Sequence, residues 1–134
     1  LRRSVESKPS AAALNDLSEV LRRLRKFEEA EQHARAAIKM SPDLYVAWET
    51  LGAILLEANK NLDEAEQSVR KAMALYADDL RIRITLARVL LKKGEVERAR
   101  ETIRQVKSRQ SELSKFDQAE LARLTEEASS GRTR

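Results

Sequence analysis

The feature that most constrains this chain is an internal repeat of about 34 residues. Three stretches resemble one another: KFEEAEQHARAAIKM, NLDEAEQSVRKAMAL and EVERARETIRQVKSR. They begin at Lys26, Asn61 and Glu95, which are 35 and 34 residues apart. Each follows an apolar stretch with helical spacing, so the repeating unit is predicted to be a helix, a short turn and a second helix. Units of this kind bury their apolar faces by stacking on one another, which predicts an all-α solenoid.

The composition agrees with an all-helical chain. Of the 134 residues, 42% are hydrophobic and 36% are charged, with only three Gly and two Pro. This suits helices with one buried and one charged face, and the scarcity of β-branched and aromatic runs disfavours a sheet. No window approaches the roughly 18 uninterrupted apolar residues of a membrane span. The absence of Cys fits a reducing compartment such as the cytoplasm and equally permits an oxidising one.

Small residues recur where the two helices of a unit should cross. Ala30, Ala65 and Ala99 occupy equivalent positions, and larger side chains there would overpack the crossing. The residues expected between the helices of a pair are Leu17, Leu51 and Leu86, and those expected to face the next unit are Ala37, Ala72 and Val106. At the helix ends, Gly94 can take a left-handed conformation, and Asn59 or Asn61 can substitute for it in the second unit.

The repeat resembles the tetratricopeptide repeat, whose signature runs Trp, Leu-Gly, Tyr, Ala, an aromatic residue, Ala and Pro. The second unit carries Trp48, Leu51, Gly52, Leu55, Ala65, Val69 and Ala72 at these places. The first unit carries Leu14, Leu17, Ser18, Leu21, Ala30, Ala34, Ala37 and Pro42, and the third carries Leu86, Ala87, Leu90, Gly94, Ala99, Ile103 and Val106. The resemblance, which covers residues 1 to about 111, implies a right-handed superhelical array of antiparallel helix pairs.

The resemblance divides the chain into six segments. LRRSVESKP aligns with ARAAIKMSP, so residues 1–10 are interpreted as the second helix of a truncated preceding repeat. Residues 11–44, 45–79 and 80–111 are three repeats, 112–128 a capping helix and 129–134 a frayed tail. A truncated fourth repeat is the alternative for 112–128. In that segment we expect one apolar face and a capping box formed by Asp117 and Glu120; the expected face consists of Leu113, Phe116, Leu121, Leu124 and Ala128.

The sequence contains no pattern of an active site. His33 is the only histidine and lies among charged neighbours, and with no Cys the usual zinc sets are excluded. Gly52, Gly94 and Gly131 are isolated, so there is no Gly-rich phosphate loop. We therefore expect no enzymatic activity, no cofactor and no metal.

Charge is distributed unevenly among the repeats. Residues 11–44 carry six basic and six acidic side chains, residues 45–79 carry three and seven, and residues 80–113 carry ten and four. The units are therefore neutral, −4 and +6. Two interpretations remain open: complementarity between neighbouring repeats, or a polarised surface that orients a partner.

In the tetratricopeptide family the first helix of each unit lines the concave side of the superhelix, which implies a partner-binding face here. The residues carried over are Asn15, Glu19 and Arg22 from the first unit, Val46, Glu49, Thr50 and Ala53 from the second, and Arg81, Ile84, Thr85, Arg88 and Lys92 from the third. Arg81, Arg88 and Lys92 share one helix face and predict a basic end of the groove. The alternative is that Glu49 and Glu57 neutralise these cations internally.

The predicted function is that of a protein interaction scaffold that binds a protein or peptide. The alternative is an architectural or oligomerising segment of a larger protein whose activity lies elsewhere. The carboxylate clamp of chaperone-binding members is disfavoured, because only Arg81 keeps the required charge and Glu19 would repel a carboxylate. A nucleic acid partner is disfavoured because the second unit is acidic, and no membrane partner is expected.

Overall fold

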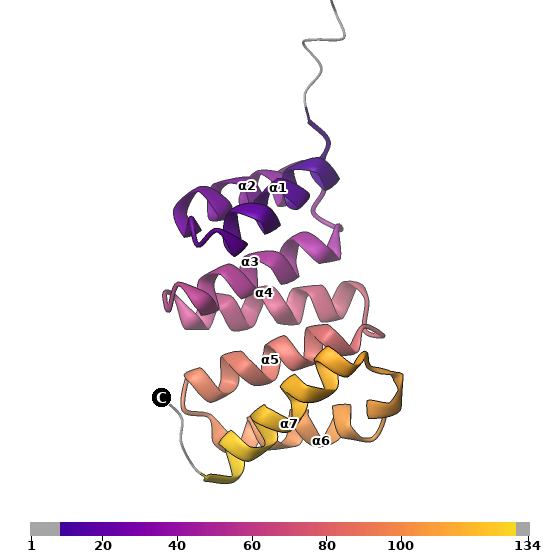
Figure 1. The fold of residues 1–134 in the computed structure, drawn as a ribbon. Coiled ribbons are helices and arrows are strands. Elements are labelled where there is room, and N and C mark those ends of the chain that lie inside the picture. Colours follow the sequence, from indigo (N-terminus) through magenta and orange to yellow (C-terminus); the bar gives the residue numbers. More distant parts are fainter. Residues whose placement is uncertain (1–8, 131–134) are drawn as a thin grey trace, which may run out of the picture.

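A computed structural model describes residues 9–130 of the chain, which form seven α-helices and one 3-10 turn without a β-strand. The elements are α1 (Ala11–Arg23), α2 (Phe27–Met40), α3 (Tyr45–Glu57), α4 (Leu62–Leu75), α5 (Leu80–Lys92), α6 (Val96–Lys107), the 3-10 turn η2 (Gln110–Glu112) and α7 (Lys115–Ser130). Figure 1 shows the helix pairs stacked in chain order, with α7 lying across α5 and α6. The predicted all-α solenoid is confirmed. The helix expected in residues 1–8 lies outside the described residues.

The two helices of each pair meet closely at small residues. Ala30, Ala65 and Ala99 are fully buried, as expected. In the second pair, a Cβ atom placed on Gly52 would lie 2.5 Å from Cγ2 of Val69 and 3.2 Å from the carbonyl oxygen of Ala65. The two backbones are therefore too close together at this crossing for a larger residue.

Because Ala65 is fully buried at this crossing, we expect Ala65→Leu to destabilise the protein by about 1–3 kcal/mol through overpacking. Chemical denaturation measures the change. The control is Ala36→Leu on the exposed side of α2, which should shift stability by less than about 0.5 kcal/mol. Equal midpoints for the wild type and Ala65→Leu would show that the crossing is looser than the structure indicates.

Three of the helices end in the same way. Arg25, Asn59 and Gly94 follow α1, α3 and α5 with φ angles of 62°, 55° and 84°. In each case the next residue donates its N–H to a carbonyl five positions earlier, for example Lys60 to Leu55 at 3.0 Å. This is the Schellman arrangement, which satisfies carbonyls at the end of a helix. The sequence indicated Asn59 and Gly94 for this role but not Arg25, because arginine rarely adopts a left-handed conformation.

One expected core residue is exposed. Leu51 and Leu86 keep 1% and 2% of their surface, whereas the equivalent Leu17 keeps 44%. Val20 and Leu24 on the same helix are also exposed. The expectation for Leu17 was wrong. Helix α2 covers the corresponding face of α3, and α4 covers that face of α5. No helix within residues 9–130 precedes α1 to cover the same face there.

Helix α7 begins differently from the prediction. Ser114 caps it, accepting a hydrogen bond from the Asp117 N–H and donating to the Asp117 carboxylate, both at 3.1 Å. The N-cap is thus Ser114, three residues before Asp117, and the predicted pair of Asp117 with Glu120 was wrong. Phe116 was also misplaced, since 80% of its surface is exposed. The helix instead packs on α5 and α6 through buried side chains, namely Leu121, Leu124 and Ala128.

Candidate partner-binding groove

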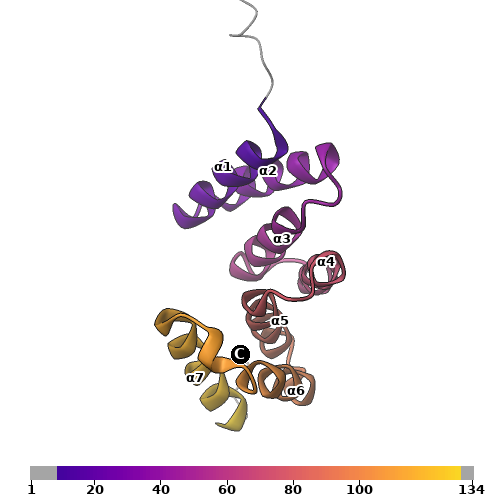
Figure 2. The same cartoon turned by 90° about the vertical axis from the view of Figure 1, so that its right-hand side faces the viewer.

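The groove lies on the side of the solenoid where the first helices of the pairs are gathered. Figure 2 shows that α1 and α7 project to the same side, with α3 and α5 between them. A hollow of about 600 Å³ opens there, which we call the concave groove. It is lined by Arg22, Arg23, Glu49, Glu57, Arg81, Ile84, Thr85, Arg88, Phe116, Asp117, Glu120 and Arg123.

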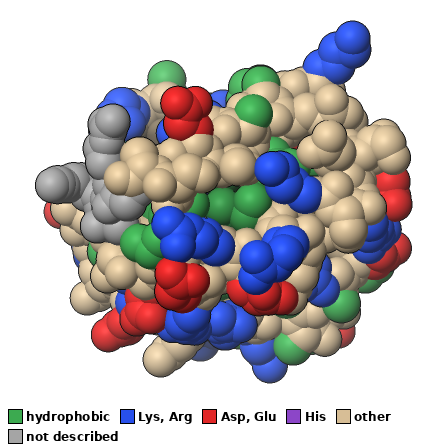
Figure 3. Space-filling model, turned by 90° about the horizontal axis from the view of Figure 1, so that it is seen from below, with side chains coloured by type: hydrophobic (Ala, Val, Ile, Leu, Met, Phe, Trp, Pro, Cys, Tyr) green, Lys and Arg blue, Asp and Glu red, His purple; other side chains and the backbone are tan. Residues whose placement is uncertain are grey.

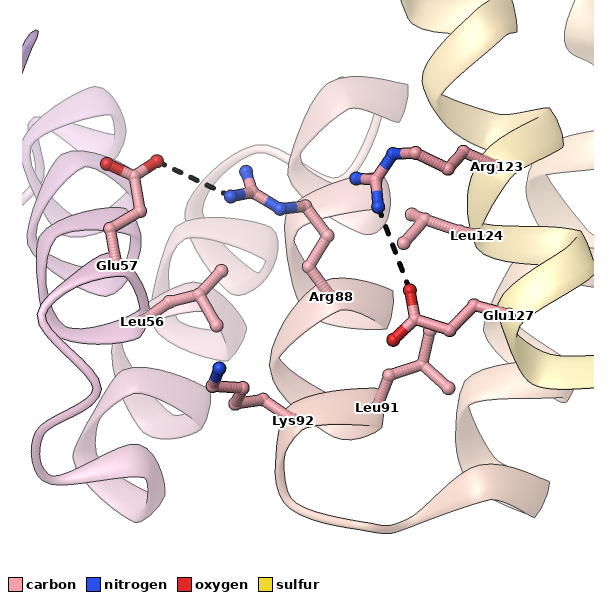
Figure 4. A pocket seen from close by; sticks show the side chains of 8 residues that line it. All are labelled: Leu56, Glu57, Arg88, Leu91, Lys92, Arg123, Leu124 and Glu127. Carbon is pink, nitrogen blue, oxygen red and sulfur yellow. Dashed lines mark hydrogen bonds and ion pairs between the residues drawn. The ribbon is translucent and has the colours of Figure 1, made fainter. Parts of the chain in front are cut away.

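The structure brings together only part of the residue set expected on the concave face. Those that line the groove are Arg22, Glu49, Arg81, Ile84, Thr85 and Arg88. Lys92 lines a neighbouring hollow of about 240 Å³ together with Leu56 and Leu124 (Figure 4). Asn15, Thr50 and Ala53 are buried, and Glu19 and Val46 are half-buried away from the groove lining. Thr50 and Ala53, which were expected on the concave face of the second unit, are therefore not part of an open surface.

Four groove residues come from α7 and were missed by sequence reasoning: Phe116, Asp117, Glu120 and Arg123. A signal was present in the spacing. Leu121, Leu124 and Ala128 follow one another at helical intervals of three and four, whereas Phe116 precedes Leu121 by five. That interval places Phe116 off the apolar face of the helix.

Alternating charges cross the groove from α1 to α7. Arg22 pairs with Glu57 at 2.7 Å, and Glu57 also contacts Arg88 at 3.4 Å. Arg88 lies 3.7 Å from Glu120, which pairs with Arg123 at 2.6 Å. We call these five residues the charge ladder. Figure 4 shows the step between Glu57 and Arg88 and a further pair of Arg123 with Glu127. The predicted alternative of internal neutralisation thus holds for Arg88, through Glu57.

Two carboxylates at the floor of this face accept hydrogen bonds from threonines on the following inner helix. Thr50 donates to Glu19 at 2.8 Å and Thr85 to Glu49 at 3.0 Å. Burial acts to raise the pKa of the Glu19 carboxyl, but the hydrogen bonds from Arg22 and Thr50 outweigh it and the pKa is lowered. For Glu49 burial dominates over the hydrogen bond from Thr85, so its pKa is raised.

Some polar groups of this side form neither an ion pair nor a side-chain hydrogen bond within residues 9–130, although Arg23 and Arg81 act electrostatically on Glu19 and Glu49. Arg23 and Arg81 are exposed, and no ion pair within residues 9–130 involves either of them. The side-chain oxygen of Asn15 is buried without a hydrogen-bond partner in the described part of the chain. Since that atom is shielded from solvent as well, of these three groups the two arginines are the ones accessible to a partner.

The opposite charges of the second and third repeats meet within the chain. Lys93 contacts Asp63 at 2.8 Å and Glu66 at 2.6 Å, and Arg98 also pairs with Glu66. Arg109 contacts Asp78 at 3.1 Å. The predicted complementarity between these two repeats is confirmed.

The end face formed by α6 and α7 is a second candidate surface. Figure 3 shows hydrophobic side chains in its middle, with Lys and Arg beside them and Asp and Glu nearby. A hollow of about 200 Å³ there includes Ile103, Arg100 and Arg104. Arg100 pairs with Glu97 at 2.8 Å, and Arg104 pairs with Glu101. This hollow is smaller than the concave groove, and these two arginines are already paired.

Comparison with known families identifies the class. Two family models described as tetratricopeptide repeat match the chain, one over residues 56–124 and the other over residues 1–45 and 16–79. The chain therefore belongs to the tetratricopeptide repeat family. Repeats of this family generally mediate protein–protein interactions and are typically non-catalytic scaffolds.

A solved structure with a similar fold is a mutant of the O-GlcNAc transferase from Thermobaculum terrenum. The similarity has a TM-score of 0.66 and 24% sequence identity, and it covers 70% of this chain and 18% of that protein. At this identity the likeness concerns the fold alone. No match was found among curated protein sequences. None of the helices in residues 9–130 combines the length and apolar character needed to cross a bilayer.

Proposed function

We propose that this segment is a non-catalytic interaction module that binds a protein or peptide partner in the concave groove. The observation that carries the proposal is the open hollow of about 600 Å³ that α1, α3, α5 and α7 line together. Its walls come from three helix pairs and the final helix, so an extended segment lying in it would contact the whole array. Stacked helical repeats form extended concave binding surfaces of this kind.

One observation favours an architectural role as a second candidate. Leu17, Val20 and Leu24 form an exposed stripe on α1. The equivalents of Leu17 in the other repeats, Leu51 and Leu86, are buried. An apolar stripe of this type is suited to packing against another helix.

The proposed function is tested with 12-residue peptides selected from a random display library on the immobilised protein. We expect selected peptides to shift the backbone amide resonances of Ile84, Thr85 and Glu49 in two-dimensional NMR spectra. Lys71, on the opposite side in α4, serves as the internal control and should not shift. Shifts confined to α4 and α6, or the failure to select any peptide, would contradict binding in the concave groove.

A further inference from the structure

The charge ladder restricts where an anionic group of a partner can bind. Arg22 and Arg88 are both held by Glu57, while Arg88 and Arg123 both face Glu120. A partner carboxylate at any of these arginines would compete with an existing ion pair. The middle of the concave groove is therefore close to electrically balanced.

Arg81 differs from the ladder arginines. It lies in the first turn of α5, where Asp79 caps the helix by accepting a hydrogen bond from the Arg81 backbone N–H at 3.0 Å. Its side chain is exposed in the groove, and none of the ion pairs within residues 9–130 includes it. The Glu49 carboxyl, on which Arg81 acts electrostatically, forms no ion pair with it and instead accepts a hydrogen bond from Thr85. Arg81 is therefore available to a carboxylate, which a guanidinium can hold through two parallel hydrogen bonds.

Phe116 supplies an apolar surface in the same groove as this arginine. Arg88 faces Glu120, and a turn further along Leu91 and Leu124 line one hollow, so α5 and α7 run side by side in the same direction. One turn earlier on the two helices are Ile84 and Phe116, and both line the concave groove together with Arg81. Phe116 is the most exposed of the large hydrophobic side chains in residues 9–130. An aromatic ring of this kind gains most from an aromatic or large aliphatic partner residue.

We infer that Arg81 and Phe116 form a two-part contact for an acidic partner segment, in which an Asp or Glu lies next to an aromatic or large aliphatic residue. This inference rests on the proposed function and adds the chemistry of the partner. A polyanion such as RNA fits less well, because Glu49, Glu57, Asp117 and Glu120 line the same groove and would repel successive phosphates. A single carboxylate needs only one unpaired arginine, and Arg81 supplies it.

The test uses the peptides selected from the 12-residue library, labelled with fluorescein and measured by fluorescence anisotropy. We expect enrichment of Asp or Glu adjacent to Phe, Tyr, Trp or Leu. Arg81→Glu and Phe116→Ser should each weaken binding at least tenfold, while Lys39→Glu on the exposed side of α2 should leave it within twofold. In the Arg81→Glu protein, a peptide whose acidic residue is replaced by Lys should regain affinity. Circular dichroism melting verifies that each variant is folded.

The outcomes separate the inference from the proposed function. The inference would be overturned, and groove binding left intact, by selected peptides that shift the resonances of Ile84 and Thr85 but lack an Asp or Glu next to an aromatic or large aliphatic residue. Peptides that bind the Arg81 and Phe116 variants with unchanged affinity would have the same consequence. Failure to bind in the concave groove at all would remove both. A fluorescein-labelled single-stranded RNA bound more tightly than the peptides, and weakened by Arg81→Glu, would also overturn the assignment of an acidic peptide.

Discussion

Leu51→Ala should destabilise the protein by about 2–5 kcal/mol, whereas Leu17→Ala should cost less than about 1 kcal/mol. The two residues occupy the same place in successive repeats. Leu51 is buried in the hydrophobic core and its truncation leaves a cavity, while Leu17 already faces solvent within the described structure. The cost of removing a leucine side chain depends on the contacts and the cavity left behind, so equal chemistry gives unequal losses.

Urea denaturation of the two variants measures this difference. Leu86→Ala is the matched control, because Leu86 is the third equivalent position and is as buried as Leu51. We expect the Leu86 variant to resemble the Leu51 variant. Similar large losses at Leu17 and Leu51 would show that the outer face of α1 is covered in solution, which would favour the architectural role.

Glu66→Gln should remove a contribution of up to about 3–4 kcal/mol to stability at pH 7. Glu66 is nearly buried on α4 and accepts hydrogen bonds from Lys93 at 2.6 Å, from Arg70 at 2.8 Å and from Arg98. Burial acts to raise the pKa of this carboxyl, but the three cations outweigh it and lower the pKa from 4.5 to about 2. Since each unit of pKa shift corresponds to about 1.4 kcal/mol, the difference between 4.5 and about 2 sets the upper bound given above.

The sign of the pH dependence follows from the direction of the shift. Because the folded-state pKa of Glu66 lies below its unfolded value, the unfolded chain takes up the proton first as the pH falls. The stabilisation is therefore complete above about pH 5 and is lost progressively toward pH 2. We expect the free energy of unfolding of the wild type to fall more steeply over this range than that of Glu66→Gln. Glu28→Gln, on the exposed first turn of α2, is the control and should follow the wild type; parallel curves for all three proteins would contradict the prediction.

Much of the fold could be predicted from the sequence because its causes are local. The 34-residue period and the alanines at the crossings specify helix pairs, since only small residues permit the close approach that Gly52 and Ala65 show. Gly94 and Asn59 marked two helix ends for a similar reason, because these residues tolerate a left-handed backbone. Arg25 adopts the same left-handed conformation although arginine does not favour it, because the helix pair requires this conformation at the end of its first helix.

The sequence by itself determined the repeat, the helix pairs and the general placement of the inner helices, because periodicity and residue size act within one unit. Tertiary structure decided which inner side chains remain accessible. Glu57 is 35 residues from Arg22 and 31 residues from Arg88 in the sequence. Whether these side chains pair depends on how each repeat is rotated relative to the preceding one. The same rotation buried Thr50 and left Arg81 open, and the docking of α7 brought Phe116 into the concave groove. These outcomes arise from contacts between units, which a repeating pattern of residues does not specify.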